Sequence, residues 1–195
     1  MNVFSRFTPL HRGGSGSPLV CLHGFTDTWR TWELVLPVLE RHHDVLAPTL
    51  PGHAGGPLLA SDAGIADVAD AVERLMDEAE LATAHIVGNS LGGYVALHLA
   101  ARGRAKSVVV LSPAGGWADV LWGTEDRLLK WPSAATRFRD DWLPQADWVV
   151  LEGVGHCPQL DIPLEAAHLI VGFTATRSAP SPFPLARFAG AAGGP

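Results

Sequence analysis

Short apolar runs alternate with segments of helical spacing along most of the chain, and this alternation limits the possible folds more than any other feature. The apolar runs include PLVCLHG, residues 18–24, and AHIVG, residues 84–88. Between them, residues 65–81 place apolar side chains along one stripe at helical spacing. Strands that alternate with helices favour a parallel sheet that is covered on both faces. We therefore predict an α/β fold with a mostly parallel sheet and helices on both sides.

The size and composition are those of one folded unit. The chain has 195 residues, of which 47% are hydrophobic and 17% are charged, and a chain of this size can bury a sizeable core. We predict a single domain over residues 1–175. Residues 176–195 are rich in Pro, Gly and Ala and lack periodicity, which predicts a flexible tail.

Charge and cysteine content argue against several classes of partner. The formal net charge is -6 and the basic residues are scattered, so no general attraction for nucleic acid or for an anionic membrane is expected. No segment approaches the ~20 apolar residues of a membrane span. Cys21 and Cys157 lack the spacing of a metal site or of a disulfide framework. We expect a cytoplasmic location.

The segment HIVGNSLGGYVAL places Ser90 between Gly88 and Gly92, where a strand-like run meets a helix-like run. A G-x-S-x-G turn is tight, so the neighbours of the serine must lack side chains, and the turn lifts the hydroxyl above the sheet. The N–H of Leu91 and the positive end of the helix can then stabilise an oxyanion. The pattern also occurs by chance, and the simpler interpretation is that Ser90 only caps the helix.

A serine hydroxyl is a poor nucleophile at neutral pH, so it needs a base and a group that orients the base. The expected order on this scaffold is serine, acid, histidine. Of the histidines after Ser90, His168 falls on an apolar-rich face of the last helix pattern and is assigned to structure. His156 lies in the glycine-containing loop GVGHCPQ after a strand and is the predicted base. Glu125 and Asp126 both follow the strand-like VLWG, at the end where sites collect, and the spacing leaves the choice between them open.

A second oxyanion donor is expected in the loop after the first long strand, LHGFTDTW. Gly24 allows the backbone to approach closely there, and the N–H of Phe25 would point into the site. An ordinary strand-to-helix turn explains this segment equally well when it is taken alone.

Together these residues resemble the α/β-hydrolase superfamily, with the segments in the family order. The similarity covers most of residues 18–175 and lies in PLVCLHGFTDTWRTW, HDVLAPTLPGHAGG, HIVGNSLGGYVALHLA, VLWGTEDRL and GVGHCPQLDIP. The resemblance implies Ser90 as nucleophile, Asp126 as acid and His156 as base, with oxyanion N–H groups from Phe25 and Leu91. GNSLGG is similar to the nucleophile elbow of esterases and of hydrolases that cleave carbon–carbon bonds in ring-fission products. Epoxide hydrolases and haloalkane dehalogenases of this fold carry Asp in place of the serine, so Ser90 argues against them.

The chain departs from the family between SVVVLSPAG and VLWGTED, where relatives carry a lid of several helices and a further packing helix. Here the interval is AGGWA, and the front of the chain is also short by one of the usual leading antiparallel strands. Parallel neighbours normally need a crossover of a dozen or more residues, whereas residues 112–119 reach at most ~25 Å when extended. The acid-bearing strand is therefore expected to pair differently, to stay partly exposed, or to be completed by a second copy of the chain.

The sequence predicts a serine hydrolase that cleaves small carboxylic esters through an acyl-enzyme, without a metal or organic cofactor. Trp117, in the shortened connection, and Asn89 are the predicted substrate-binding residues. One alternative is a catalytically impaired binding protein or shortened relative. The other is a carbon–carbon bond hydrolase, which ranks lower because those enzymes resemble ones that grip substrate with a lid. Without a lid, apolar surface near Phe25, Leu91, Trp117 and Pro113 is expected to give an open site and to favour a homodimer.

Overall fold

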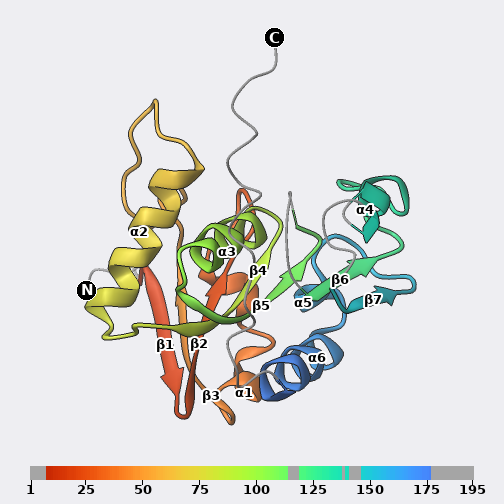
Figure 1. The fold of residues 1–195 in the computed structure, drawn as a ribbon, viewed down its shortest axis with the longest axis horizontal. Helices are drawn as coiled ribbons and strands as arrows, with labels where there is room; N and C mark the ends of the chain where they lie inside the picture. Colours follow the sequence, from red (N-terminus) through yellow and green to blue (C-terminus); the bar gives the residue numbers. More distant parts are fainter. Residues whose placement is uncertain (1–7, 114–118, 138, 141–145, 177–195) are drawn as a thin grey trace, which may run out of the picture.

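A seven-stranded sheet forms the centre of the computed structural model, which describes residues 8–113, 119–137, 139–140 and 146–176 (Figure 1). The strands are β1 (Leu10–Gly14), β2 (Ser17–Leu22), β3 (His43–Pro48), β4 (Ala84–Asn89), β5 (Ala105–Leu111), β6 (Asp119–Gly123) and β7 (Trp148–Leu151). They lie in the order β1-β3-β2-β4-β5-β6-β7. Among these strands β1 alone runs antiparallel to its neighbour, β3. The prediction of an α/β fold with a mostly parallel sheet is confirmed.

Helices cover both faces of the sheet, as predicted. They are η1 (Trp29–Trp32), α1 (Leu36–Leu39), α2 (Ile65–Glu78), α3 (Leu91–Ala101), α4 (Ser133–Arg137), α5 (Pro158–Asp161) and α6 (Pro163–Thr176). Successive side chains of a strand point to opposite faces, so Leu19 and Cys21 of β2 share a core with η1, α1 and α6. Val20 and Leu22 share the other core with α2 and α3. Figure 1 shows α1 and α6 side by side. Because both faces are covered, β2 is apolar without alternation.

The strand expected to carry the acid, β6, pairs in parallel with β5. Residues 119–121 pair with residues 109–111, which are the last part of β5. The connection over residues 112–118 therefore returns by about two residues along β5, or ~7 Å, well within its reach of ~25 Å. Residues 120–122 are fully buried. The expectation of a different pairing or a partly exposed strand is wrong, because the shallow register removes the need for a long crossover.

Two stacked tryptophans pack together on β6 and β7. The rings of Trp122 and Trp148 lie 6.3 Å apart between centroids, at an interplanar angle of 16°. Trp122 Nε1 donates a hydrogen bond of 3.1 Å to the carbonyl of Leu129, and Ala135 of α4 joins the same core. These contacts bury β6 within the chain itself. Completion of the sheet by a second copy stays a prediction.

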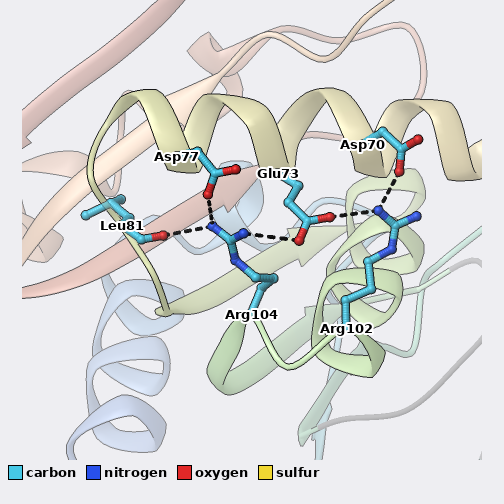
Figure 2. A network of polar contacts seen from close by, with 6 residues as sticks. All are labelled: Asp70, Glu73, Asp77, Leu81, Arg102 and Arg104. Carbon is cyan, nitrogen blue, oxygen red and sulfur yellow. Dashed lines mark hydrogen bonds and ion pairs between the residues drawn. The ribbon is translucent and has the colours of Figure 1, made fainter.

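An ion-pair network fixes α2 against the turn between α3 and β5 (Figure 2). Asp70, Glu73 and Asp77 lie on one face of α2, at the spacing that brings side chains together. Arg102 contacts Asp70 at 2.5 Å and Glu73 at 2.8 Å, while Arg104 contacts Glu73 at 3.1 Å and Asp77 at 2.6 Å. Single exposed pairs contribute about 0–1 kcal/mol, but networks contribute more. The network holds the far end of α3, the helix that begins directly after Ser90.

The described part of the chain begins shortly before β1 and ends with α6. Among the described residues, β1 is the strand that precedes β2. The expected loss of one leading strand stays a prediction. The predicted tail over residues 176–195 lies outside the described residues apart from Thr176, where α6 ends. A single domain over residues 1–175 stays a prediction. Over the described ranges, the helices are too short or too polar to cross a membrane.

Candidate active site

The predicted elbow at Ser90 is a strained turn between β4 and α3. Ser90 has φ 49° and ψ -111°, and its side chain makes no capping hydrogen bond to α3. A Cβ added to Gly88 would lie 2.3 Å from the carbonyl of Gly92, and one added to Gly92 would lie 2.2 Å from the carbonyl oxygen of Leu22. Both glycines are therefore required by close backbone approach. The geometry favours a nucleophile elbow over the simpler role of a helix cap.

Backbone strain gathers at the carboxyl edge of the sheet. Four non-glycine residues in the described chain have positive φ, and three of them, Thr26, Ser90 and Ser112, follow β2, β4 and β5. Each such conformation costs about 1–3 kcal/mol and persists where the surrounding structure enforces it, often at a functional site. The exception is Glu80, after α2. The strain therefore marks the same edge as the motif.

The loop after β2 packs directly on the elbow. A Cβ on Gly24 would lie 3.0 Å from Asn89 Oδ1 and 3.5 Å from the Cβ of Ser90. Phe25 follows with its side chain 74% exposed. Leu91 is the first residue of α3, where a backbone N–H has no partner within its own helix. Both predicted oxyanion donors thus come from segments that adjoin Ser90.

His23 controls the direction of the Phe25 N–H. The His23 side chain is fully buried, and Nδ1 lies 2.7 Å from the Gly24 carbonyl oxygen while Nε2 accepts a 2.8 Å hydrogen bond from the N–H of Leu50. A carbonyl can only accept, so Nδ1 carries the proton. Burial lowers the pKa of His23 to about 4. Because the Gly24 carbonyl and the Phe25 N–H point in opposite directions across one trans peptide, holding the carbonyl also aims the N–H.

Asp126 is the acidic candidate that contacts His156. Its Oδ2 lies 2.8 Å from His156 Nδ1, and its side chain is fully buried. Its Oδ1 accepts hydrogen bonds from the backbone N–H groups of Leu128 and Leu129, at 2.9 and 2.8 Å. Glu125 is exposed to solvent. Since a carboxylate accepts, His156 Nδ1 carries the proton of this bond, and Nε2 is left as the basic nitrogen.

Glycine at the end of β6 brings the loop of the histidine close to the turn of the acid. A Cβ on Gly123 would lie 2.1 Å from the carbonyl oxygen of Val154 and 2.5 Å from that of Gly155. The N–H of Glu125 donates to the Val154 carbonyl at 2.9 Å, and the N–H of Gly155 donates to Asp161 Oδ2 at 2.8 Å. These backbone contacts set the position from which His156 reaches Asp126.

Asn89, the residue before Ser90, links the elbow to the histidine loop. Its side chain is 1% exposed, and Nδ2 donates to the carbonyl of Leu111 at 3.1 Å and to that of His156 at 3.0 Å. Its Oδ1 accepts from the Cys157 thiol at 3.6 Å. The amide contacts the protein itself in this structure, so its predicted contact with substrate stays a prediction. The predicted substrate contact Trp117 lies outside the described residues.

The other residues considered in the sequence analysis, His168 and Cys157, do not act as base or nucleophile in this site. His168 is exposed on α6, so its predicted place on an apolar face is wrong; Ala167 and Ile170 form the buried side of that helix. Burial raises the pKa of Cys157 to about 11, with the carboxylates of Asp27, Asp161 and Asp126 acting in the same direction. The thiol is therefore protonated near neutral pH. No group of three or more metal-binding side chains occurs in the part of the chain that the structure describes.

Sequence reasoning missed His23, the positioning contacts of Asn89 and the packing role of Gly123. Each depends on contacts between segments far apart in the chain. The HG pair at the end of β2 and the glycine after VLW were the available signals. They indicated close backbone approach without naming the partner.

Comparison with known proteins identifies the family of this fold. A family model described as "Alpha/beta hydrolase family" matches residues 19–140. The chain belongs to the alpha/beta hydrolase family. The chain is 34% identical over 128 residues to 2-hydroxymuconate semialdehyde hydrolase of Pseudomonas sp. The matched residues cover 60% of this chain and 45% of that protein. The chain is 62% identical over 50 residues to "Epoxide hydrolase EphH" of Mycobacterium tuberculosis, covering 26% of this chain and 23% of the relative.

The chain thus spans less than half the length of these curated relatives. Among solved structures, the chain is similar to a meta-cleavage product hydrolase from Pseudomonas fluorescens, with a TM-score of 0.79 and 18% identity over 86% of this chain and 93% of that one. It is also similar to a thermophilic esterase from Thermogutta terrifontis, with a TM-score of 0.79 and 16% identity over 87% and 93%. Likeness at this level of identity supports the fold.

Proposed function

We propose that the protein is a serine hydrolase that cleaves carboxylic esters through an acyl-enzyme. Ser90 attacks the ester carbonyl while His156 Nε2 takes the hydroxyl proton, and the Asp126 carboxylate stabilises the resulting imidazolium. The N–H groups of Phe25 and Leu91 hold the oxyanion, and loss of one such donor costs about 3–4 kcal/mol of barrier. The tetrahedral intermediate collapses as His156 returns the proton to the departing alcohol.

The second half of the cycle repeats the first with water as nucleophile. His156 takes a proton from water, which attacks the acyl carbon on Ser90, and the oxyanion forms again between the same N–H groups. His156 then returns the proton to Ser90 Oγ as the carboxylic acid leaves. Atoms and charges balance with an ester and water as reactants and an acid and an alcohol as products.

The single observation that carries the proposal is the fully buried Asp126 carboxylate, whose two oxygens have different hydrogen-bond partners. One oxygen accepts two backbone N–H groups and the other lies 2.8 Å from His156 Nδ1. A buried carboxylate without partners would be costly, so this arrangement is a specific one. It also fixes the tautomer that leaves Nε2 of His156 unprotonated, which is the form that a base requires.

A second candidate reaction is hydrolysis of a carbon–carbon bond next to a ketone. The similarity to 2-hydroxymuconate semialdehyde hydrolase favours it. Epoxide opening is not proposed despite the local similarity to an epoxide hydrolase. Attack of Ser90 Oγ on an epoxide carbon would leave an alkyl ether, which water does not cleave readily, whereas a carboxylate nucleophile leaves an ester.

Turnover of p-nitrophenyl acetate and butyrate by the wild type and by Ser90→Ala tests the proposal. We expect turnover that disappears in Ser90→Ala, and equal rates in the two proteins would refute the role of Ser90. A ring-fission dienone measured beside the esters separates the two reactions. A higher kcat/KM on the dienone would replace ester cleavage by carbon–carbon cleavage.

We also propose a cytoplasmic location, an open site and a tendency to form homodimers. Cys21 and Cys157 are both free thiols, as expected in a reducing compartment. Phe25 exposes 74% of its surface beside the elbow, and an exposed apolar surface at a site often binds a ligand or a second copy. The reaction proposed needs no metal or organic cofactor.

A further inference from the structure

His53 contacts two residues of the loop that carries the proposed oxyanion donor. Its ring centroid is 4.9 Å from that of His23 and 5.8 Å from that of Phe25, with interplanar angles of 78° and 86°. These two residues flank Gly24, and Gly24 packs on the elbow beside Ser90. One layer of side chains therefore connects His53 to the site.

One nitrogen of His53 is a buried acceptor without a partner. Nδ1 lies 3.1 Å from the carbonyl oxygen of Pro51, and a carbonyl only accepts, so Nδ1 carries the proton. In the neutral ring Nε2 is then an acceptor. Nε2 is buried and makes no hydrogen bond, which is costly for a polar atom. An unpaired atom of this kind beside a site indicates a missing donor.

The neighbouring Phe25 ring is poorly anchored. The ring meets His53 edge to face, yet the residue is 74% exposed. A side chain with so little burial gains little from its present rotamer, because hydrophobic stabilisation is proportional to the area removed from water. Rotation of Phe25 away from His53 is therefore inexpensive. Such a rotation would remove the Phe25 ring from its contact with the His53 imidazole.

We propose that His53 is a specificity-determining residue that accepts a hydrogen bond from a hydroxyl group on the acyl chain of the substrate. This inference rests on the proposed function and narrows its substrate class to hydroxyacyl esters. The donor would lie a few bonds from the scissile carbonyl, since the carbonyl oxygen is held by the Phe25 N–H on the near side of the same loop. Phe25 turns aside when the hydroxyacyl chain binds.

Two esters that differ by one hydroxyl test the proposal: p-nitrophenyl butyrate and p-nitrophenyl 3-hydroxybutyrate. The readout is the ratio of their kcat/KM values, so each variant is compared with itself. We expect the wild type to favour the hydroxy ester by about fivefold to tenfold, as one neutral hydrogen bond allows. His53→Leu should bring the ratio near one, and His53→Gln, which keeps an acceptor, should recover part of it. His42→Leu, at an exposed histidine, should leave the wild-type ratio.

If His53 had only a structural role, His53→Leu would lower kcat/KM for both esters by the same factor and would lower the melting temperature. We expect the melting temperature to change little, because the substitution removes the unpaired Nε2 together with the Nδ1–H donor to the Pro51 carbonyl. Equal ratios in the wild type and His53→Leu would overturn the proposal.

A binding measurement separates failure of this inference from failure of the proposed function. If neither ester is hydrolysed, ester cleavage is wrong, and butyrate and 3-hydroxybutyrate are titrated into Ser90→Ala with the His53 ring protons followed by NMR. A shift with 3-hydroxybutyrate that butyrate does not produce supports the inference. The same response to both acids refutes it.

Discussion

Replacing Asp126 by Asn should retain the fold and abolish most of the activity, for a reason that depends on two backbone contacts. Asp126 Oδ1 accepts from the N–H groups of Leu128 and Leu129 at 2.9 and 2.8 Å. In Asp126→Asn the amide oxygen must keep this place, because the amide NH₂ cannot accept. The NH₂ group then faces His156 Nδ1 and donates to it.

The cost of the opposite amide orientation follows from the same contacts. It would leave two partly buried N–H groups unpaired, at no more than about 1–3 kcal/mol each, or at most about 2–6 kcal/mol together. The amide is therefore held in one orientation. His156 Nδ1 becomes the acceptor, Nε2 carries the proton, and no base faces Ser90. The equivalent change in Ser-His-Asp proteases lowers kcat by about 10⁴, and we expect a loss of about 10³ to 10⁴ here.

Ester turnover and thermal unfolding of Asp126→Asn are measured beside Glu125→Gln. Glu125 is the exposed neighbour, and surface substitutions usually change stability by at most about 0.5 kcal/mol. We expect near wild-type turnover in Glu125→Gln. A folded Asp126→Asn protein that keeps more than about a tenth of wild-type kcat would refute the assignment of Asp126 as the group that orients His156.

The other predictions concern stability, positioning and association. Asn89→Ala removes a donor from the partly buried His156 carbonyl and from the Leu111 carbonyl, which keeps the N–H of Ser90. We expect a loss of about 1–3 kcal/mol by urea unfolding and a lower kcat with a smaller change in KM; an unchanged kcat would contradict the positioning role. Gly92→Ala places a Cβ 2.2 Å from a carbonyl oxygen and should abolish soluble folded protein on circular dichroism, whereas a folded and active variant would show that the elbow can relax. Burial lowers the pKa of His85 to about 4, so the stability that neutral His85 contributes is complete above pH 6.5 and is lost as the pH falls. Between pH 7 and pH 5 the free energy of unfolding should therefore drop by about 2 kcal/mol. This drop should be smaller in His85→Asn when the urea midpoints at the two pH values are compared. Sedimentation across a concentration series should show association, and a monodisperse monomer would remove the homodimer proposal.

The sequence was sufficient for the features that depend on short segments. The turn from β4 through Ser90 to α3 is local, and Gly88 is required by its close approach to Gly92 within that turn. Gly92 in turn meets the backbone of Leu22, from a distant segment of the chain. The sheet followed from apolar runs that are buried on both faces. The order of serine, acid and histidine then placed each candidate at the carboxyl edge.

Features that depend on register or on distant partners were not accessible in this way. The short connection between β5 and β6 suggested that the two strands could not pair in parallel. The pairing begins only at Val109, near the end of β5, so a short connection is sufficient. No local sequence pattern encodes that register. Glu125 and Asp126 follow the same strand, and the turn that buries one and exposes the other is set by Leu128 and Leu129. The unpaired nitrogen of His53 becomes visible only when the surrounding rings are in place.

Covalent labelling with a fluorophosphonate probe tests most directly whether Ser90 is an activated nucleophile. Mass spectrometry of digested protein locates the probe, and Asp126→Asn and Ser90→Ala serve as matched controls. We expect stoichiometric labelling on the peptide that contains Ser90, none there in Ser90→Ala, and a rate lower by at least about 100-fold in Asp126→Asn. Folded wild-type protein that stays unlabelled at Ser90 would contradict the proposed hydrolase and favour a hydrolase-fold binding protein.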